Sequence, residues 1–269
     1  MPEGPEIHRA ADRIAAAIAQ RPLTEVFFAF DHLKQYEAEF CDRTVLRVAP
    51  QGKAMLIYLE GDWVIYSHNQ LYGKWMIRKV YNYPQTKRQL RLALHNDQKS
   101  ALLYSASDIA VLRTEELAFH PFLQRIGPDV LAPETTVSMV RDRFTADRFR
   151  RRKFTTLLLD QQFLAGLGNY LRSEILFVAR VHPERHPQDC AEAELVALAE
   201  AAIAIPRQSY ATGGITNDVE HAHQLRAEGL RRSAYRHWVF SRQGKPCWVC
   251  GTPIVKAVSA GRGYYLCPH

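Results

Sequence analysis

Short strand-like runs fill the first half of the chain, and this pattern limits the fold more than any other feature. Between Leu23 and about Ser107, apolar and β-branched residues recur in short runs separated by turn residues. The clearest runs are residues 25–30, 54–59, 63–66, 90–94 and 101–104, and Glu60-Gly61-Asp62 joins the second to the third. Strand runs with turn signals of this kind predict an all-β layer structure, here a β-sandwich.

The flanking segments follow a different period. Residues 5–19 place Ile7, Ala11, Ile14 and Ile18 on one helical face, and Pro5 suits a first helical turn. Residues 109–135 are rich in loop signals, 136–206 are mostly helical, and 235–269 form a small β-hairpin module with cysteines. We therefore predict an α+β protein with a catalytic β-sandwich domain at 1–120, a hinge at 121–135, a helical domain at 136–234 and a C-terminal module at 235–269.

The net charge indicates the class of partner. The chain of 269 residues has a formal charge of +7 and a pI of about 9.2, which favours a polyanionic partner. Basic residues cluster from Arg141 to Lys153, and again from Arg226 to Arg242 among the aromatic rings of Tyr235, Trp238 and Phe240. Such patches neutralise phosphates, although a solvated charged face explains either one equally well. No run is long enough to cross a membrane and no signal peptide is visible, so we expect a soluble intracellular protein.

The N-terminus constrains the chemistry. The chain opens Met-Pro-Glu-Gly-Pro-Glu, and a small second residue usually allows removal of Met1, which would leave Pro2 with a free secondary amine. An α-amine has a reference pKa near ~8, so a useful fraction is nucleophilic at neutral pH. A secondary amine attacks an aldehyde carbon to give an iminium ion, and the neighbouring Glu3 can move a proton. Many chains begin Met-Pro by chance, so the pair needs support from other segments.

Residues 157–170 carry a possible phosphate site. An apolar helical run ends here, Gly166 and Gly168 permit tight turns, and Asn169 is a suitable N-cap for a following helix. The N–H groups and dipole at a helix N-terminus favour a phosphate. An ordinary helix–turn–helix packing element is the competing explanation.

The cysteines at the C-terminus predict a metal site. Cys247 and Cys250 have the C-x2-C spacing that provides half of a tetrahedral zinc site, and Cys267 would open the second half. The fourth ligand would follow His269, because His269 itself is poorly spaced for the role. Cys41 and Cys190 are expected to be buried thiols outside this site.

Six segments, spread over nearly the whole chain, carry a family resemblance. They are residues 1–7 (MPEGPEI), 51–53 (QGK), 66–73 (YSHNQLYG), 127–129 (GPD), 167–170 (LGNY) and the three C-terminal cysteines. In this order they resemble endonuclease VIII, a bacterial family within the formamidopyrimidine-DNA glycosylase superfamily. The resemblance implies a β-sandwich, a helix–two-turn–helix domain and a zinc finger with one structural Zn²⁺. It also implies a monomeric DNA glycosylase and AP lyase that excises oxidised pyrimidines from duplex DNA in base excision repair.

The resemblance also implies roles for single residues. Pro2 would be the Schiff-base nucleophile, Glu3 the acid/base that opens the sugar, and Lys53 a second acid/base for β-elimination. Arg262 would hold a phosphate and assist δ-elimination. The implied DNA contacts are Asn169 and Arg125 on the backbone and Gln70, Leu71 and Tyr72 as a wedge that fills the space of the extruded nucleotide. Glu6 and Asp129 match family positions near the site. The implied location is the bacterial cytoplasm, at the nucleoid.

Three other interpretations remain open at this stage. The first is a formamidopyrimidine/8-oxoguanine glycosylase of the same superfamily, against which the Gln70-Leu71-Tyr72 wedge argues. The second is a damaged-DNA-binding protein without activity, against which Pro2, Glu3 and Lys53 argue. A tautomerase with an N-terminal proline would need neither the basic patches nor the cysteine module. Residues 213–237 are longer than the family pattern suggests, so no role is inferred for them.

Overall fold

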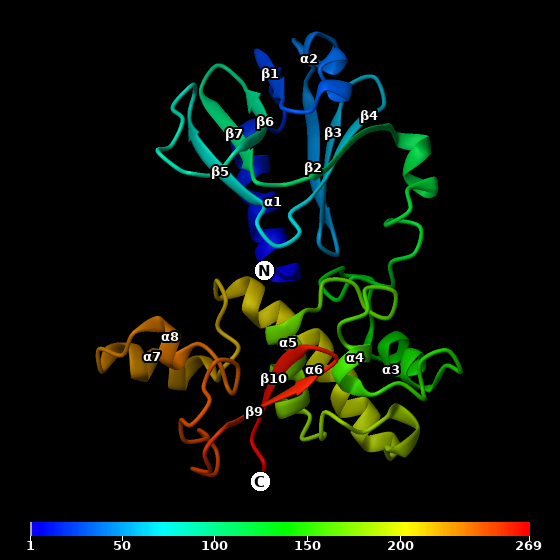
Figure 1. The fold of residues 1–269 in the computed structure, drawn as a ribbon, viewed down its shortest axis with the longest axis vertical. Coiled ribbons are helices and arrows are strands. Elements are labelled where there is room, and N and C mark those ends of the chain that lie inside the picture. The colour runs from blue at the N-terminus through cyan, green and yellow to red at the C-terminus, as the bar shows by residue number, and fades with distance from the viewer. Residues whose placement is uncertain (1) are drawn as a thin grey trace. The chain divides into compact units, whose positions relative to one another are not determined.

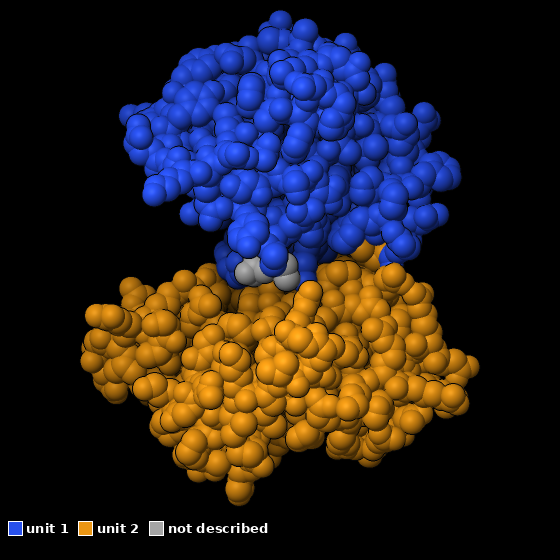
Figure 2. Space-filling model, viewed as in Figure 1, with its two compact units in different colours: residues 1–2, 6–125 blue, residues 3–5, 126–269 orange. Residues whose placement is uncertain are grey.

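The computed structural model describes residues 2–269, so the expected removal of Met1 concerns a residue outside them. The chain folds into two compact units (Figure 2). Unit 1 contains residues 1–2 and 6–125, and unit 2 contains residues 3–5 and 126–269. The short segment 3–5 thus packs with the second unit although it belongs to the N-terminus. The domain bounds inferred from the sequence stay a prediction.

Unit 1 is the predicted β-sandwich, built from two four-stranded antiparallel sheets. One sheet has the order β1-β6-β7-β5 and the other the order β2-β3-β4-β8. The strands of the first sheet are β1 (Glu25–Phe28), β5 (Lys74–Lys79), β6 (Leu90–His95) and β7 (Lys99–Tyr104). Those of the second are β2 (Val45–Gln51), β3 (Ala54–Leu59), β4 (Trp63–His68) and β8 (Asp108–Arg113). Every strand run predicted from the sequence is therefore a strand, although β1 ends two residues early.

The helix α1 (Gly4–Ile18) is the blue helix of Figure 1. It carries the apolar face that its period predicted. Ile7, Ile14 and Ile18 are buried in one core with the inner faces of both sheets. The same core includes Phe28 of β1 and Phe40 of α2 (Gln35–Phe40), a short helix that the sequence analysis missed. Two short 3-10 turns, η1 (Asp31–Leu33) and η2 (Thr114–Phe119), complete the unit.

Unit 2 is mainly helical. Its helices are α3 (Val137–Thr145), α4 (Phe154–Leu157), α5 (Asn169–Val178), α6 (Glu192–Ala211), α7 (Val219–Ala227) and α8 (Arg232–Tyr235), with the 3-10 turn η3 (Pro187–Asp189). Phe144, Phe154 and Phe163 form the centre of its core, which also contains Leu171 and Leu198. The hairpin of β9 (Val255–Ser259) and β10 (Arg262–Leu266) follows, as the sequence predicts. Long loops interrupt the region 136–206, so it is less helical than expected.

The segment after α6 is fixed by a buried carboxylate. Glu174 of α5 is fully buried and accepts hydrogen bonds from the backbone N–H groups of Trp238, Val239 and Phe240 at 2.8, 2.9 and 2.9 Å. The hydroxyl of Thr216 also donates to it. One side chain therefore ties both ends of the segment 216–240 to the centre of unit 2. This segment overlaps residues 213–237, for which no role was inferred from the sequence.

Two other features qualify the sequence analysis. Cys41 is exposed rather than buried, because it directly follows the last residue of α2 at the surface, and Cys190 is only partly buried. Their thiols donate to the backbone oxygens of Thr24 and His186. Within residues 2–269, no helix has the length and apolar character needed to cross a membrane.

Candidate active site

The carboxylate of Glu3 sits on the N-terminus of α5. Glu3 is only 2% exposed, and its two oxygens accept hydrogen bonds from the backbone N–H groups of Tyr170 (2.9 Å) and Leu171 (3.2 Å). A helix leaves its first N–H groups without partners inside the helix, and its dipole favours a negative charge there. Glu3 therefore caps a helix whose bonded residues lie 167 and 168 positions away in the sequence, and the orientation of its carboxylate is fixed.

Glycines make this approach possible. A Cβ on Gly168 would lie 2.4 Å from Cδ of Glu3, which is closer than real atoms approach. Gly166 has φ +93°, a conformation that L side chains rarely adopt, and its carbonyl accepts from the N–H of Gly4 at 2.7 Å. The Gly166 and Gly168 turns thus serve to admit the N-terminal segment, a purpose that the spacing of the glycines did not reveal.

Asn169 takes a different position from the one predicted. It is the first residue of α5, and Gly168 occupies the N-cap position without any side-chain cap. The cap prediction is wrong because the helix begins one residue earlier than expected, and the Glu3 carboxylate already binds the N–H group of Leu171, which an Asn169 cap could have used. Its Oδ1 instead accepts a hydrogen bond from Nη2 of Arg172 at 2.7 Å.

Arg172 is a residue that the sequence analysis missed. It is fully buried, and its Nη2 also donates to the carbonyl of Gly263 at 3.0 Å, while Nη1 donates to the carbonyl of Thr155. Burial, with the charge of Arg262 as a smaller cause, lowers the pKa of Arg172 to about 10. Arg172 therefore joins Asn169 to the start of strand β10, which carries Arg262. The signal in the sequence was a pair of charged residues, Arg172 and Glu174, in a helix whose other residues are mainly apolar.

A second group of predicted residues meets at one end of a sheet in unit 1. Lys53 lies in the turn between β2 and β3, where Gly52 has φ +62°, and is only 7% exposed. Ala54 pairs with His68 and His68 pairs with Asp108, so the turn, the end of β4 and the start of β8 lie at the same end of the sheet. Burial lowers the pKa of His68; the charge of Asp108 opposes this effect, and the charge of Lys53 adds to it.

The predicted wedge, Gln70, Leu71 and Tyr72, follows the end of β4 at this end of the sheet. The turn closes with a hydrogen bond from the N–H of Gly73 to the carbonyl of Asn69 at 2.7 Å. Gln70 has φ +49°, and its Oε1 accepts from the hydroxyl of Ser107 at 2.7 Å. Leu71 and Tyr72 remain 60% and 70% exposed. Large apolar side chains on a fixed, exposed turn are the form that an intercalating wedge requires.

The other predicted residues are less closely grouped. Pro2 is partly buried and belongs to unit 1 by its contacts. Arg125 is exposed, and its Nε donates to the carbonyl of Pro121 at 2.8 Å. Arg262 is exposed at the start of β10. Glu6 and Asp129, which match family positions near the site, each contact a residue nearby in the sequence. Glu6 forms an ion pair with Arg9 at 2.7 Å, and Asp129 accepts a hydrogen bond from the N–H of Leu131 at 2.9 Å.

Many cations of the two basic clusters found in the sequence form ion pairs or ring contacts within unit 2. In the first, Arg150, Arg152 and Lys153 form ion pairs with Asp147, Asp160 and Glu184. In the second, Arg242 is buried and lies over the ring of Trp248 at 4.0 Å, and Tyr235 is buried as well. Local ion pairs and packing therefore use much of the charge that the sequence pattern suggested for phosphates.

The three C-terminal cysteines do come together. The thiol sulfurs of Cys247, Cys250 and Cys267 lie within 4.8 Å of one another, and the sulfurs of Cys250 and Cys267 are 3.4 Å apart. Three soft sulfur donors at this spacing fit one face of a tetrahedral Zn²⁺ ion. Within the part of the chain that the structure describes, the cluster has three ligands, and the fourth ligand beyond His269 stays a prediction.

Models of known protein families match three parts of the chain. Residues 1–107 match the formamidopyrimidine-DNA glycosylase N-terminal domain and residues 126–220 match the formamidopyrimidine-DNA glycosylase H2TH domain. Residues 244–269 match the zinc finger found in FPG and IleRS. The cysteine cluster therefore belongs to a zinc-finger module that fits one structural zinc ion.

Curated relatives match over the whole chain. Endonuclease 8 of Shigella sonnei (strain Ss046) is 48% identical over 268 residues, which cover 100% of this chain and 98% of that protein. Endonuclease 8 of Escherichia coli (strain K12 / DH10B) has the same identity and coverage.

Solved structures show the same fold at lower identity. Formamidopyrimidine-DNA glycosylase of Lactococcus lactis, solved with DNA containing an abasic site, has a TM-score of 0.81 and 21% identity over 99% of this chain and 98% of its own. MutM in complex with DNA containing carbocyclic 8-oxo-G has a TM-score of 0.82 and 20% identity at the same coverage. The 48% identity over the full chain, together with the three matched domains, shows that this chain belongs to the endonuclease VIII family of the formamidopyrimidine-DNA glycosylase superfamily and is a base excision repair DNA glycosylase and AP lyase.

Proposed function

We propose that this enzyme excises oxidised pyrimidines from duplex DNA through a Schiff base on Pro2 and then cleaves the strand by β,δ-elimination. The observation that carries the proposal is the fixed carboxylate of Glu3, which directly follows Pro2 and is held by two N–H groups of α5. An amine nucleophile needs a proton-transfer group within reach of the same sugar. Adjacent positions in the chain provide that proximity.

The first half of the reaction replaces the base by the enzyme. With Met1 removed, the lone pair of the Pro2 nitrogen attacks C1′, and the C1′–N bond to the damaged base breaks with its electron pair leaving on the base. The proton on the attached Pro2 nitrogen passes to the departing base. The C1′–O4′ bond then breaks as Glu3 protonates O4′, and the lone pair of the Pro2 nitrogen forms the C=N bond. The product is an iminium ion between Pro2 and C1′.

The second half breaks the strand. The iminium ion acidifies the C2′ proton, and Lys53 is the base proposed to remove it, which expels the 3′-phosphate. Loss of the C4′ proton, which conjugation with the iminium ion makes acidic, then expels the 5′-phosphate in a second elimination, and water hydrolyses the C=N bond to release Pro2. The product is a one-nucleotide gap with a phosphate on each side.

The phosphates need cationic and N–H partners during both eliminations. Asn169 at the start of α5 and Arg262 in the finger hairpin are the residues we propose for this role, with Arg125 on the DNA backbone. Arg172 positions Asn169 and the strand that carries Arg262, because it donates hydrogen bonds to Oδ1 of Asn169 and to the carbonyl of Gly263. The proposed role of zinc is structural: it holds the hairpin that presents Arg262.

Oxidised pyrimidines are the favoured substrate because of the wedge. Gln70, Leu71 and Tyr72 form the triplet that the family resemblance associates with the pyrimidine-specific branch, and two of the three side chains are strongly exposed. A solved relative, the Lactococcus lactis protein, is described in complex with an oxidised pyrimidine containing DNA. Excision of 8-oxoguanine is the second candidate. The proposed place of action is the bacterial nucleoid in the cytoplasm.

Borohydride trapping on defined lesions tests the function. The protein is made with an N-terminal extension that a protease removes to expose Pro2, and both forms are mixed with duplexes containing thymine glycol, 8-oxoguanine or an abasic site. We expect covalent adducts only after cleavage of the extension, with thymine glycol trapped faster than 8-oxoguanine. An extended protein that forms adducts as fast as the cleaved one would exclude Pro2 as nucleophile. Faster trapping of 8-oxoguanine would exclude the pyrimidine assignment.

A further inference from the structure

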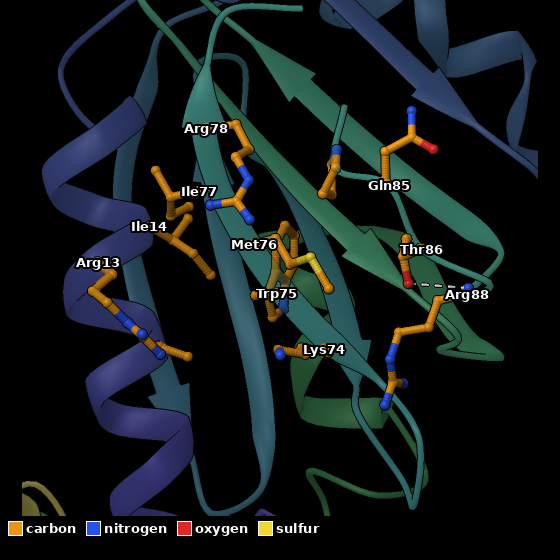
Figure 3. Close-up of a pocket in the computed structure, with 12 residues that line it drawn as sticks. Arg13, Ile14, Lys74, Trp75, Met76, Ile77, Arg78, Gln85, Thr86 and Arg88 are labelled. Atoms are coloured by element: carbon orange, nitrogen blue, oxygen red, sulfur yellow. Dashed lines mark hydrogen bonds between the residues drawn. The ribbon is translucent and has the colours of Figure 1, made fainter. Parts of the chain in front are cut away.

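A basic groove lies along the edge of the sandwich in unit 1, on the edge strand β5. It is a hollow of about 480 Å³ between α1, β5 and the segment 84–88 (Figure 3). Arg13 and Ile14 of α1 line one side, and Thr86 and Arg88 line the other, with residues 74–78 of β5 between them. None of the residues that line it is acidic.

Four cations line this groove and three line its neighbour. The groove has Arg13, Lys74, Arg78 and Arg88, and a second hollow beside Tyr72 shares Arg88 and adds Lys87 and Arg91. No ion pair involving any of these six side chains occurs among residues 2–269 of the structure. This sets them apart from the cluster at 141–153, where neighbouring carboxylates neutralise several cations.

The sequence of this region has a strong charge bias. From Trp63 to Asn96 there is no Asp or Glu at all, while Lys or Arg occurs at positions 74, 78, 79, 87, 88 and 91. The ring of Tyr72 is 70% exposed and lines the second hollow beside these cations, whereas Tyr81 and Tyr83 pack on the ring of His95. Cations that follow a groove, with an aromatic ring available for base stacking, are typical of surfaces that bind single-stranded nucleic acid.

The groove is continuous with the proposed wedge. Lys74 follows the wedge turn after only one residue, Gly73, and the guanidinium of Arg88 donates a hydrogen bond to the carbonyl of Tyr72. Along β5, residues at i and i+4 share a face, so Lys74 and Arg78 point the same way and lie about 13 Å apart at ~3.3 Å per residue. A strand of DNA that leaves the wedge therefore finds cations over a length of several nucleotides, at ~3.4 Å per nucleotide in one strand.

From these observations we propose that the groove binds the sugar-phosphate backbone of an unpaired DNA strand that continues past the wedge. The inference rests on the proposed function, since it uses the wedge as the point where the DNA reaches unit 1. A hollow of this volume falls in the range of sites for single small molecules, about 300–1,000 Å³, and admits one nucleotide unit, while the cations of the neighbouring hollow extend the surface along the strand. The enzyme would thereby hold lesions that lie next to a single-stranded region.

The experiment compares two DNA substrates that differ only in an unpaired extension. Both carry a stable abasic-site analogue, and one has a single-stranded oligo-dT extension next to the lesion, made in each polarity. Affinity is measured by fluorescence anisotropy at several salt concentrations. The variants are Arg13→Gln with Arg78→Gln in the groove, and the matched control Lys79→Gln with Lys99→Gln, which removes the same charge from a neighbouring pair of strand positions outside the groove.

For the wild type we expect about fivefold to tenfold tighter binding of the extended substrate in one polarity. The groove variant should lose this gain but bind the blunt duplex within about twofold of the wild type, and the control should keep the gain. Loss of two phosphate contacts to a single strand should also reduce the slope of log K against log salt by about 1.4, at ~0.7 per contact.

Three outcomes would overturn the inference. One is an absence of any gain for the wild type in both polarities, and another is a gain that the groove variant retains. The third is displacement of the extension by a poly-glutamate peptide of equal charge as readily as by oligo-dT, which would assign the groove to an acidic protein partner. Borohydride trapping of the blunt lesion duplex by the same variants reports on the proposed chemistry separately, so a failure of the groove and a failure of the Schiff-base proposal are distinguishable.

Discussion

Gly168 and Glu3 approach so closely that a methyl group on Gly168 would lie 2.4 Å from Cδ of Glu3. The two residues are far apart in the sequence, and their contact brings the segment that follows Pro2 onto the N-terminus of α5. Any side chain at position 168 must displace the carboxylate. The contact therefore makes Gly168 part of the arrangement that positions the proposed acid/base.

Replacement of Gly168 by Ala tests this relationship. We expect Gly168→Ala to reduce base excision strongly, on the order of the ~10²–10⁴-fold that a positioned acid/base contributes, because the added methyl forces Glu3 away from the N–H groups of Tyr170 and Leu171. Single-turnover excision of thymine glycol measures the effect, and circular dichroism and thermal melting confirm the fold. A folded variant with wild-type excision would show that the Glu3 position is not needed.

Glu3→Gln separates proton transfer from position. The amide has nearly the shape of the carboxylate but cannot donate and accept the same protons, so base excision should fall by about 10²–10⁴-fold. Cleavage of a preformed abasic site should fall much less, because the aldehyde needs no base displacement. Rates on the two substrates are compared with the same enzyme preparation. Equal losses would mean that Glu3 acts in both steps alike or supports the structure only.

The wedge should matter only where bases are stacked. Leu71→Ala with Tyr72→Ala should slow excision from duplex DNA more than cleavage of a single-stranded abasic substrate, because unstacking costs a few kcal/mol that the wedge offsets. Leu46→Ala is a suitable control, since Leu46 is also an exposed apolar residue of unit 1, at 44% exposure. Uniform losses on both substrates, accompanied by a lower melting temperature, would assign the two side chains to the stability of the sandwich.

His237 should make unit 2 sensitive to acid. Burial, reinforced by the charges of Arg236, Arg232 and Arg242, lowers the pKa of His237 to about 3, from 6.5 in the unfolded chain. The unfolded state therefore binds more protons between these two values, so the free energy of unfolding should fall as pH drops from about 6.5 towards 3, by at most ~1.4 kcal/mol per pH unit. Glu174 acts in the opposite sense, because burial raises its pKa above 4.5.

The measurement is the stability of His237→Gln against pH. The variant should show a shallower loss of stability between pH 6.5 and 5 than the wild type, whatever its stability at pH 7. His223→Gln replaces an exposed histidine of α7 and is the matched control. Parallel pH profiles for the wild type and His237→Gln would refute the assignment.

Loss of one cysteine should uncouple DNA binding from the chemistry. Cys247→Ser removes one of the three converging sulfur donors, so the protein should lose its zinc, and the hairpin that carries Arg262 should lose order. We expect weaker binding of abasic DNA, with a Pro2 amine that still reacts with a small aldehyde. Cys41→Ser, at an exposed thiol far from the cluster in sequence, should keep both metal and affinity. Normal DNA binding by the zinc-free variant would exclude the proposed role of the finger.

The sequence by itself determined the local structure and much of the chemistry. The strand runs between Leu23 and Ser107, the apolar face of α1 and the finger hairpin could be predicted because their periods follow directly from backbone geometry. The cysteine spacing predicted the sulfur cluster, since C-x2-C is a property of a short turn. The family motifs named Pro2, Glu3 and Lys53, whose catalytic roles stay predictions.

Only the tertiary structure decided which of these groups meet. The local pattern predicted Asn169 as the cap of α5, but the buried carboxylate of Glu3 binds the first N–H groups of that helix. The pattern could not reveal this contact, because Glu3 is distant from α5 in the sequence. The buried links of Arg172 and Glu174 also depend on segments distant in the chain. The same holds for the groove along β5, whose cations form no ion pair within residues 2–269. A sequence period reports on neighbours along the chain, whereas burial and charge pairing depend on contacts that form only when the chain folds.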